Sequence, residues 1–197
     1  DGEFTDSQTI TVTVNAVNDA PTANAASGQT DEDQSVVIAL SGDDIDGDNL
    51  TFTLESDGAN GSVTLDGSLA TYAPNGNYFG DDSFTFSVSD GEYSATADVS
   101  VSVAAVNDAP VLASVSDVSF DEDGSGSISL SADDVDGDDL TFGISGGSDD
   151  VAATLDGSSV SFDSSDNYNG SASFVVSVTD GEFTDSQTIT VTVNAVN

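Results

Sequence analysis

Residues 83–90 read SFTFSVSD, and residues 173–180 read SFVVSVTD. In the first stretch Phe84, Phe86 and Val88 alternate with serine and threonine. Because successive side chains of a β-strand point to opposite faces, this period of two predicts strands with one face in a core and the other in water. The two stretches therefore predict an all-β fold in which the same unit occurs twice.

The regions around these stretches carry the same signal. Shorter apolar alternations occupy residues 36–40, 50–54, 99–103, 128–130, 140–144 and 189–193. Asp66-Gly67 and Asp156-Gly157 lie between short strand-like runs and predict tight hairpin turns. No stretch shows a helical period. About seven short strands in about 90 residues predict an antiparallel Greek-key β-sandwich of immunoglobulin (Ig) type. With no cysteine or tryptophan, each core must consist of Val, Ile, Leu, Phe and Tyr.

Internal duplication sets the expected domain organisation. The repeated motifs are VNDAP (17–21 and 106–110), SGDDIDGDNLTF with SADDVDGDDLTF (41–52 and 131–142), and DED (31–33 and 121–123). We therefore predict a first repeat at residues 18–107 and a second at residues 108–197.

The first residues of the chain duplicate its last ones. Residues 1–18 and 180–197 are identical at all 18 positions, whereas residues 90–107 match them at 8 of 18. We therefore expect residues 1–17 to be the final strand of a preceding repeat, in an array that alternates two unit types. Two interpretations stay open: this strand marks only where the segment was cut, or it adds to an open sheet edge of another chain.

The charge excludes several classes of function. The chain has 37 acidic residues, a net charge of −37, and no lysine, arginine or histidine. Such a surface repels nucleic-acid phosphates and anionic lipid headgroups, so we expect no nucleic-acid partner and no membrane insertion. Catalytic Ser-His, Cys-His and lysine chemistry and His/Cys zinc sites are impossible. We predict that the chain is not an enzyme.

The carboxylates form two matching clusters. Asp43, Asp44, Asp46 and Asp48 recur as Asp133, Asp134, Asp136 and Asp138, with Asp139 next. Like charges about 4 Å apart repel by about 1 kcal/mol in water and more near a protein surface. With no cationic side chain, the counter-charge must come from solution. Oxygen ligands on a flexible loop suit Ca²⁺ better than Mg²⁺. The alternatives are solvated acidic turns and a surface adapted to high salt.

The order of the motifs resembles a known family. VNDAP, the DxDGDxLTF run and the segment at residues 78–91 are similar to the bacterial cadherin-like tandem repeats of giant secreted adhesins, including RTX-type adhesins. The resemblance covers both units. It implies Ig-like sandwiches arranged end to end, an extracellular or cell-surface location, and Ca²⁺ at each junction between neighbouring repeats.

The resemblance also implies ligands. At the internal junction these are Glu32, Asp81, Asp82, Asn107, Asp108, Asp134, Asp136, Asp138 and Asp180. At the start of the first unit they are Asn18, Asp19, Asp44, Asp46, Asp48 and Asp90. The second unit departs from the pattern, because Ser171 and Ala172 stand where the first has two aspartates.

These observations predict a calcium-binding extender segment of a long adhesin or filament, a structural spacer in cell adhesion. Two alternatives remain. One is a calcium-dependent module that binds carbohydrate or other copies of itself, for which Tyr72, Tyr78, Phe79 and Tyr168 offer aromatic faces, although packing explains them better. The other is a filament subunit joined by strand exchange.

Overall fold

The computed structural model describes residues 2–3 and 5–197. It consists of two compact units: unit 1 ends at Val106, and unit 2 comprises Asn107–Asn197. The described residues form strands, turns and loops without any helix, which confirms the all-β prediction. It follows that, within this part of the chain, no helix is available to cross a membrane. The exact repeat bounds of 18–107 and 108–197 stay a prediction.

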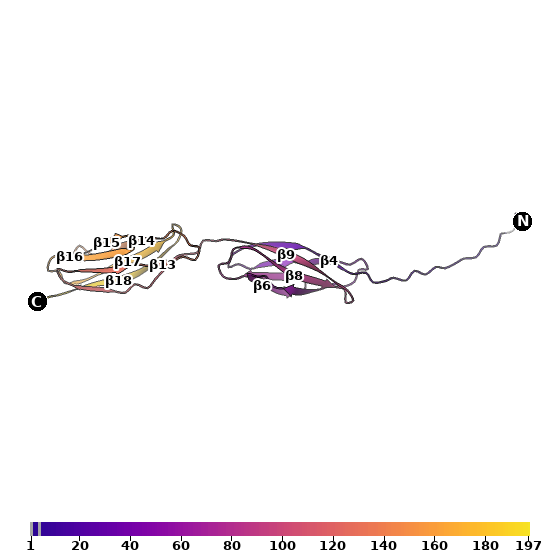
Figure 1. Ribbon diagram of the computed structural model, residues 1–197, viewed down its shortest axis with the longest axis horizontal. Coiled ribbons are helices and arrows are strands. Elements are labelled where there is room, and N and C mark those ends of the chain that lie inside the picture. The colour runs from indigo at the N-terminus through magenta and orange to yellow at the C-terminus, as the bar shows by residue number, and fades with distance from the viewer. Residues whose placement is uncertain (1, 4) are drawn as a thin grey trace. The chain divides into compact units, whose positions relative to one another are not determined.

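Unit 1 is a β-sandwich of nine strands among the described residues (Figure 1). The strands are β1 (Thr22–Asn24), β2 (Ala26–Asp31), β3 (Val36–Ala39), β4 (Ser41–Asp43), β5 (Thr51–Ser56), β6 (Gly61–Asp66), β7 (Leu69–Pro74), β8 (Gly80–Ser89) and β9 (Ser94–Ala104). A four-stranded sheet has the order β2-β9-β8-β5, a three-stranded sheet has the order β3-β7-β6, and β1 pairs with β4. β2 runs parallel to β9, while the other pairs are antiparallel.

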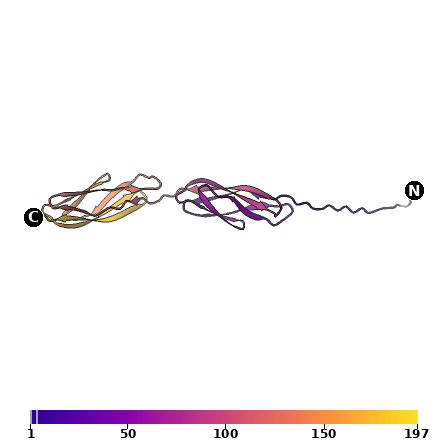
Figure 2. The same ribbon diagram turned by 60° about the horizontal axis from the view of Figure 1, so that its bottom comes forward.

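Unit 2 repeats this topology. It is the unit that ends at the yellow C-terminus in Figure 2. Its strands are β10 (Val111–Leu112), β11 (Val118–Asp121), β12 (Ser125–Ser129), β13 (Ala132–Asp133), β14 (Thr141–Gly146), β15 (Val151–Asp156), β16 (Ser159–Ser164), β17 (Gly170–Thr179) and β18 (Thr184–Asn194). The sheets are β11-β18-β17-β14, β12-β16-β15 and the pair β10-β13. β11 runs parallel to β18.

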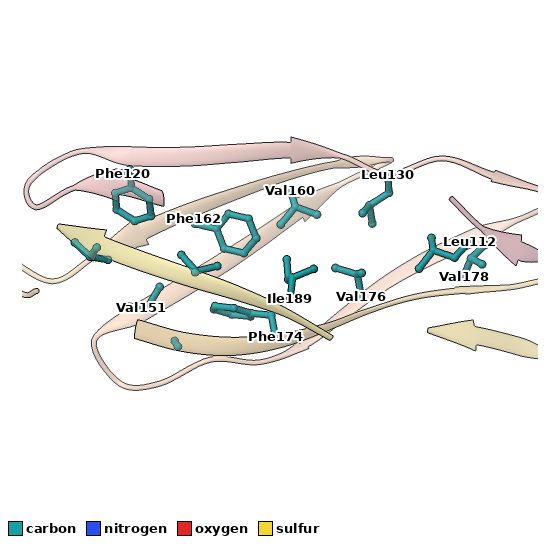
Figure 3. Close-up of a cluster of buried hydrophobic side chains, with 13 residues drawn as sticks. Leu112, Phe120, Leu130, Val151, Val160, Phe162, Phe174, Val176, Val178 and Ile189 are labelled. Atoms are coloured by element: carbon teal, nitrogen blue, oxygen red, sulfur yellow. The ribbon is translucent and has the colours of Figure 1, made fainter. Parts of the chain in front are cut away.

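The alternating stripes form the cores, as the sequence predicts. In β8, Phe84, Phe86 and Val88 are at most 1% exposed. In unit 2, Phe174 of β17 lies opposite Ile189 of β18, and both point into the core (Figure 3). Burying a large apolar side chain contributes about 1.5–3 kcal/mol, so these stripes supply much of the driving force for folding.

The predicted hairpin turns are also confirmed. β6 and β7 are joined through Gly67, which has a φ of 60°, and β15 and β16 through Gly157, which has a φ of 59°. Glycine adopts this left-handed conformation without the steric penalty that other residues incur.

Residues 5–21 form no strand, and their apolar side chains are exposed. Ile10, Val12 and Val14 are 82%, 79% and 88% exposed. Residues 1 and 4, which belong to the predicted final strand of a preceding repeat, lie outside the described residues. The assignment of residues 1–17 to a preceding repeat stays a prediction.

Candidate metal centre

In unit 1, three separate segments bring their acidic residues together. The side-chain amide of Asn18 donates to Asp90 Oδ2 at 3.0 Å, and the backbone amide of Asp19 donates to Asp46 Oδ2 at 2.8 Å. Asp90 follows the last residue of β8, so the residues before β1, the loop after β4 and the loop after β8 meet at one end of the sandwich. We call Asn18, Asp19, Asp44, Asp46, Asp48 and Asp90 the unit 1 cluster.

Asp44 organises the loop that carries this cluster. Its Oδ1 accepts backbone amides from Asp46, Gly47 and Asp48 at 2.8, 3.0 and 3.3 Å. Gly47 has a φ of 82°, which allows the loop to curl around the carboxylate. Asp44 Oδ2 is buried and has no hydrogen-bond partner. A buried carboxylate oxygen without a partner costs free energy, so this atom is a candidate cation ligand.

The carboxylate of Asp90 is held in its ionised form. The backbone amides of Tyr93 and Glu92 donate to Asp90 Oδ1 at 2.7 Å each. With the Asn18 side chain, these amides hold the pKa of Asp90 below its ordinary value, although partial burial acts in the opposite direction. An ionised carboxylate is the form that binds a hard cation.

Unit 2 repeats the same contacts. The side-chain amide of Asn107 donates to Asp180 Oδ2 at 2.9 Å, and the backbone amide of Asp108 donates to Asp136 Oδ2 at 2.7 Å. Asp134 Oδ1 accepts the amide of Asp136 at 2.9 Å. We call Asn107, Asp108, Asp134, Asp136, Asp138 and Asp180 the unit 2 cluster.

The unit 2 cluster contains a compact group of carboxylates. One oxygen from each of Asp134, Asp136 and Asp138 lies within 4.8 Å of the other two. Asp134 Oδ2 is buried without a hydrogen-bond partner, like its counterpart in unit 1. At such separations each pair of negative charges repels by about 1 kcal/mol in water and several-fold more beside a protein surface. Charge, oxygen chemistry and the partnerless buried atom together fit a divalent cation such as Ca²⁺.

The pKa of Asp180, like that of Asp90, lies below its ordinary value. Burial by itself would raise the pKa of Asp180. The Asn107 side chain and the backbone amides of Glu182 and Phe183 outweigh this effect and hold the pKa of Asp180 below its ordinary value. Both clusters therefore combine ionised carboxylates with an asparagine whose amide nitrogen already has a partner.

Glu32 lies at the opposite end of unit 1 from the unit 1 cluster. It follows β2, whose last residue pairs with Ala104 at the end of β9, and it is 3% exposed. Glu32 Oε1 accepts the backbone amide of Val106 at 2.6 Å, while Oε2 is buried without a hydrogen-bond partner. Asp81 flanks the same end of β9 through its pairing with Ser102.

Asp82, also a sequence-predicted ligand, has a different environment. Its oxygens accept hydrogen bonds from the amides of Ala59, Asn60 and Ser83 and from the hydroxyl of Tyr72, at 2.8–3.0 Å. Asp82 is only 9% exposed. Four donors satisfy this carboxylate inside the unit, so we leave Asp82 out of the proposed cation site.

Glu122 was not among the sequence-predicted ligands. Its Oε1 accepts the backbone amide of Val196 at 2.7 Å, and its amide donates to the carbonyl of Asn194 at 2.8 Å. Glu32 makes the corresponding contacts with Val106 and Ala104. The repeated DED motif could have identified Glu122, because Glu122 has the same place in residues 121–123 as Glu32 has in residues 31–33.

Three of the four aromatic residues considered for carbohydrate stacking make contacts within their own unit. Tyr72 is fully buried, and the hydroxyl of Tyr78 donates to the carbonyl of Asp81 at 2.7 Å. Tyr168 packs against the unit 2 core, whereas Phe79 is 56% exposed. These positions support packing as the main role of the tyrosines.

The strand order and the repeated acidic ends define a class of tandem Ig-like, cadherin-like β-sandwiches. The family model for the bacterial Ig domain matches residues 18–102 and 107–192. The chain therefore belongs to the bacterial Ig domain family, in two tandem copies.

Solved structures support the fold assignment. The chain is 19% identical to Drosophila N-cadherin EC1-4, with a TM-score of 0.62, over 91% of this chain and 50% of that one. It is 18% identical to human protocadherin-24 EC1-2, with a TM-score of 0.54, over 92% of this chain and 100% of that one. At these identities the likeness shows the fold alone.

An enzyme also appears among the matches. An endo-fucoidan hydrolase from glycoside hydrolase family 107 is 23% identical over 90% of this chain and 29% of the hydrolase, with a TM-score of 0.39. The chain thus spans less than a third of that protein, and the TM-score is too low to support an argument for catalysis. No curated protein matches the chain.

Proposed function

We propose that this chain is a calcium-binding extender segment of a long extracellular adhesin or filament, in which it serves as a structural spacer. The observation that carries the proposal is Asp134 Oδ2, a buried carboxylate oxygen without a hydrogen-bond partner, inside a group of three carboxylates. Its counterpart Asp44 Oδ2 recurs in unit 1. Recurrence in both units is what a ligand site predicts and what solvated turns do not require.

The proposed ligands are oxygen atoms of the unit 1 cluster in unit 1 and of the unit 2 cluster in unit 2. Calcium would supply the positive charge that the chain lacks, since its net charge is −37 without a single Lys or Arg. Asn107 directly follows Val106, the last residue of unit 1. A cation that fixes Asn107 and Asp108 would therefore restrict the segment through which the chain passes from one unit to the next.

The expected stabilisation is a large part of a small domain's stability. A ligand that binds only the folded state contributes about 2.7 kcal/mol when its concentration is 100 times its dissociation constant. Small domains are stable by only about 5–15 kcal/mol. Extracellular calcium modules commonly have dissociation constants of about 10⁻⁴–10⁻³ M, so we expect the segment to work in a calcium-rich exterior.

Thermal unfolding and small-angle X-ray scattering across a calcium titration test this function, starting from EDTA. We expect millimolar calcium to raise the melting temperature and to narrow the distribution of dimensions in solution. Magnesium and NaCl are the controls for charge screening. If NaCl raises the melting temperature as much as calcium does, the acidic clusters are a salt-adapted surface and not calcium sites. If calcium raises the melting temperature but does not change the scattering, the chain binds calcium but is not a calcium-stiffened spacer.

A further inference from the structure

In each unit the last strand pairs in parallel with a strand near the start of the unit. β2 pairs with β9 along six residues in unit 1, and β11 pairs with β18 along only four in unit 2. The chain enters a unit before the earlier strand and leaves it after the last one. Because the two strands run in the same direction, tension along the chain pulls them past each other and loads all the bonds between them together.

In unit 2, side-chain contacts continue this alignment where the backbone ladder stops. The ladder begins at Val118, which lies opposite Val191. One residue earlier, Asp117 Oδ1 accepts the backbone amide of Thr190 at 2.7 Å. This hydrogen bond keeps the register of the ladder, although a side chain replaces the backbone carbonyl as the acceptor.

Two further side chains of β18 extend the contacts towards the start of unit 2. Gln187 Oε1 accepts the backbone amide of Val115 at 3.0 Å, and Gln187 Nε2 donates to the carbonyl of the same residue at 2.6 Å. Asp185 Oδ2 accepts the backbone amide of Leu112 at 2.9 Å. The side-chain amide of Gln187 thus offers one donor and one acceptor, as a backbone residue of a neighbouring strand does. We call Asp185 and Gln187 the clasp.

Unit 1 makes the same connection with its backbone. Ala95 and Ala97 occupy the positions of the clasp, and neither side chain can form a hydrogen bond. Counted within the repeat, the parallel ladder of unit 1 starts two residues earlier than that of unit 2, with Ala26 opposite Val99. The longer ladder of unit 1 and the clasp of unit 2 therefore join equivalent segments by different means.

We propose that the clasp carries mechanical tension in unit 2, by holding β18 to the segment before β11 when the chain is pulled from its two ends. The inference rests on the proposed spacer function, because a spacer in a long adhesin transmits force along its length. It does not depend on calcium. The clasp supplies three hydrogen bonds, and their loss should raise the unfolding rate at a fixed tension by about tenfold or more.

Force measurements with optical tweezers test the proposal in the full chain. The chain has no cysteine, so Ala105→Cys/Asn197→Cys attaches handles on either side of unit 2. In EDTA and NaCl, the clasp variant Asp185→Ala/Gln187→Ala should unfold about tenfold faster than its parent at one fixed tension. The matched control Thr188→Ala changes an exposed side chain of the same strand and should alter the rate by no more than about twofold.

A second pulling direction separates the bearing of force from general stability. Handles at Ser158→Cys/Asn197→Cys load β16 and β18 and leave residues 107–121 outside the path of the force. In this direction the clasp variant should accelerate unfolding several-fold less than in the first. No acceleration in the first direction, or equal acceleration in both, would overturn the proposal. Neither result bears on calcium binding, which calorimetry of the unmodified chain measures separately, so a failure of the clasp and a failure of the calcium-binding spacer are distinguishable.

Discussion

The hydroxyl of Tyr72 donates to Asp82 Oδ2 at 2.8 Å inside unit 1, and unit 2 has Phe162 and Ala172 at these two positions. Both partners are thus replaced together. Complete hydrogen bonding offsets the cost of burying the Asp82 carboxylate, and an apolar pair of similar shape is an alternative solution. The two units therefore fill equivalent core positions by different chemistry.

Asp82→Ala should destabilise unit 1 by about 3 kcal/mol, because it leaves the Tyr72 hydroxyl and three backbone amides without their acceptor. Hydrogen exchange followed by mass spectrometry, resolved for each unit, measures this change. The neighbouring Asp81→Ala is the matched control and should change stability by less than about 0.5 kcal/mol, since Asp81 is exposed. Equal effects of the two variants would contradict the role given to Asp82.

The contribution of Asp82 should depend on pH in a defined direction. Burial raises the pKa of Asp82, but its four hydrogen-bond donors, led by the amide of Asn60, outweigh burial and lower the pKa. Because the folded pKa lies below the unfolded value of about 3.9, the stabilisation is complete above that value and is lost as pH falls through the folded pKa. The stability gap between wild type and Asp82→Ala should shrink below about pH 4. A constant gap down to pH 2.5 would argue against an ionised Asp82.

Gly61 explains why Tyr72 fits unit 1. A Cβ on Gly61 would overlap the Tyr72 ring, and unit 2 has Val151 at this position, buried in the same core as Phe162. Gly61→Val alone should cost unit 1 at least about 2 kcal/mol through overpacking. The triple change Gly61→Val/Tyr72→Phe/Asp82→Ala transplants the unit 2 set and should recover stability relative to Gly61→Val. Denaturant unfolding of the two variants checks this, and no recovery would contradict the equivalence.

Features that depend on local periodicity and on turn motifs, such as strands and hairpin turns, could be predicted from the sequence. The alternation over residues 83–90 located a buried strand, and Asp66-Gly67 located a hairpin turn. The sequence could not reveal the parallel pairing of β2 with β9, which depends on contacts about 70 residues apart. From its place in the motif, Asp82 was predicted to be a calcium ligand. Its burial and its hydrogen bond from the Tyr72 hydroxyl depend on the folded structure and could not be inferred from the sequence.

Glu32→Gln tests whether the end of unit 1 opposite the unit 1 cluster also binds a cation. Glutamine can keep the hydrogen bond from the Val106 amide through its side-chain oxygen, but it removes the buried negative charge. In EDTA we expect unit 1 to be as stable as wild type or more stable. We expect millimolar calcium to stabilise unit 1 of the variant less than unit 1 of wild type, because the variant lacks the buried Glu32 Oε2 atom, which has no hydrogen-bond partner. Hydrogen exchange of unit 1 with and without calcium measures both, and an unchanged calcium response would exclude Glu32 as a ligand.

Isothermal titration calorimetry measures calcium binding by the two clusters without relying on a change in stability or shape. Wild type should bind Ca²⁺ with a dissociation constant of about 10⁻⁴–10⁻³ M or tighter, in the presence of excess NaCl. Asp44→Asn/Asp134→Asn removes the charge of the two carboxylates whose Oδ2 atoms are buried without partners, and should lose most of this heat. No binding by wild type, or equal binding by the double variant, would show that the two clusters are not calcium sites.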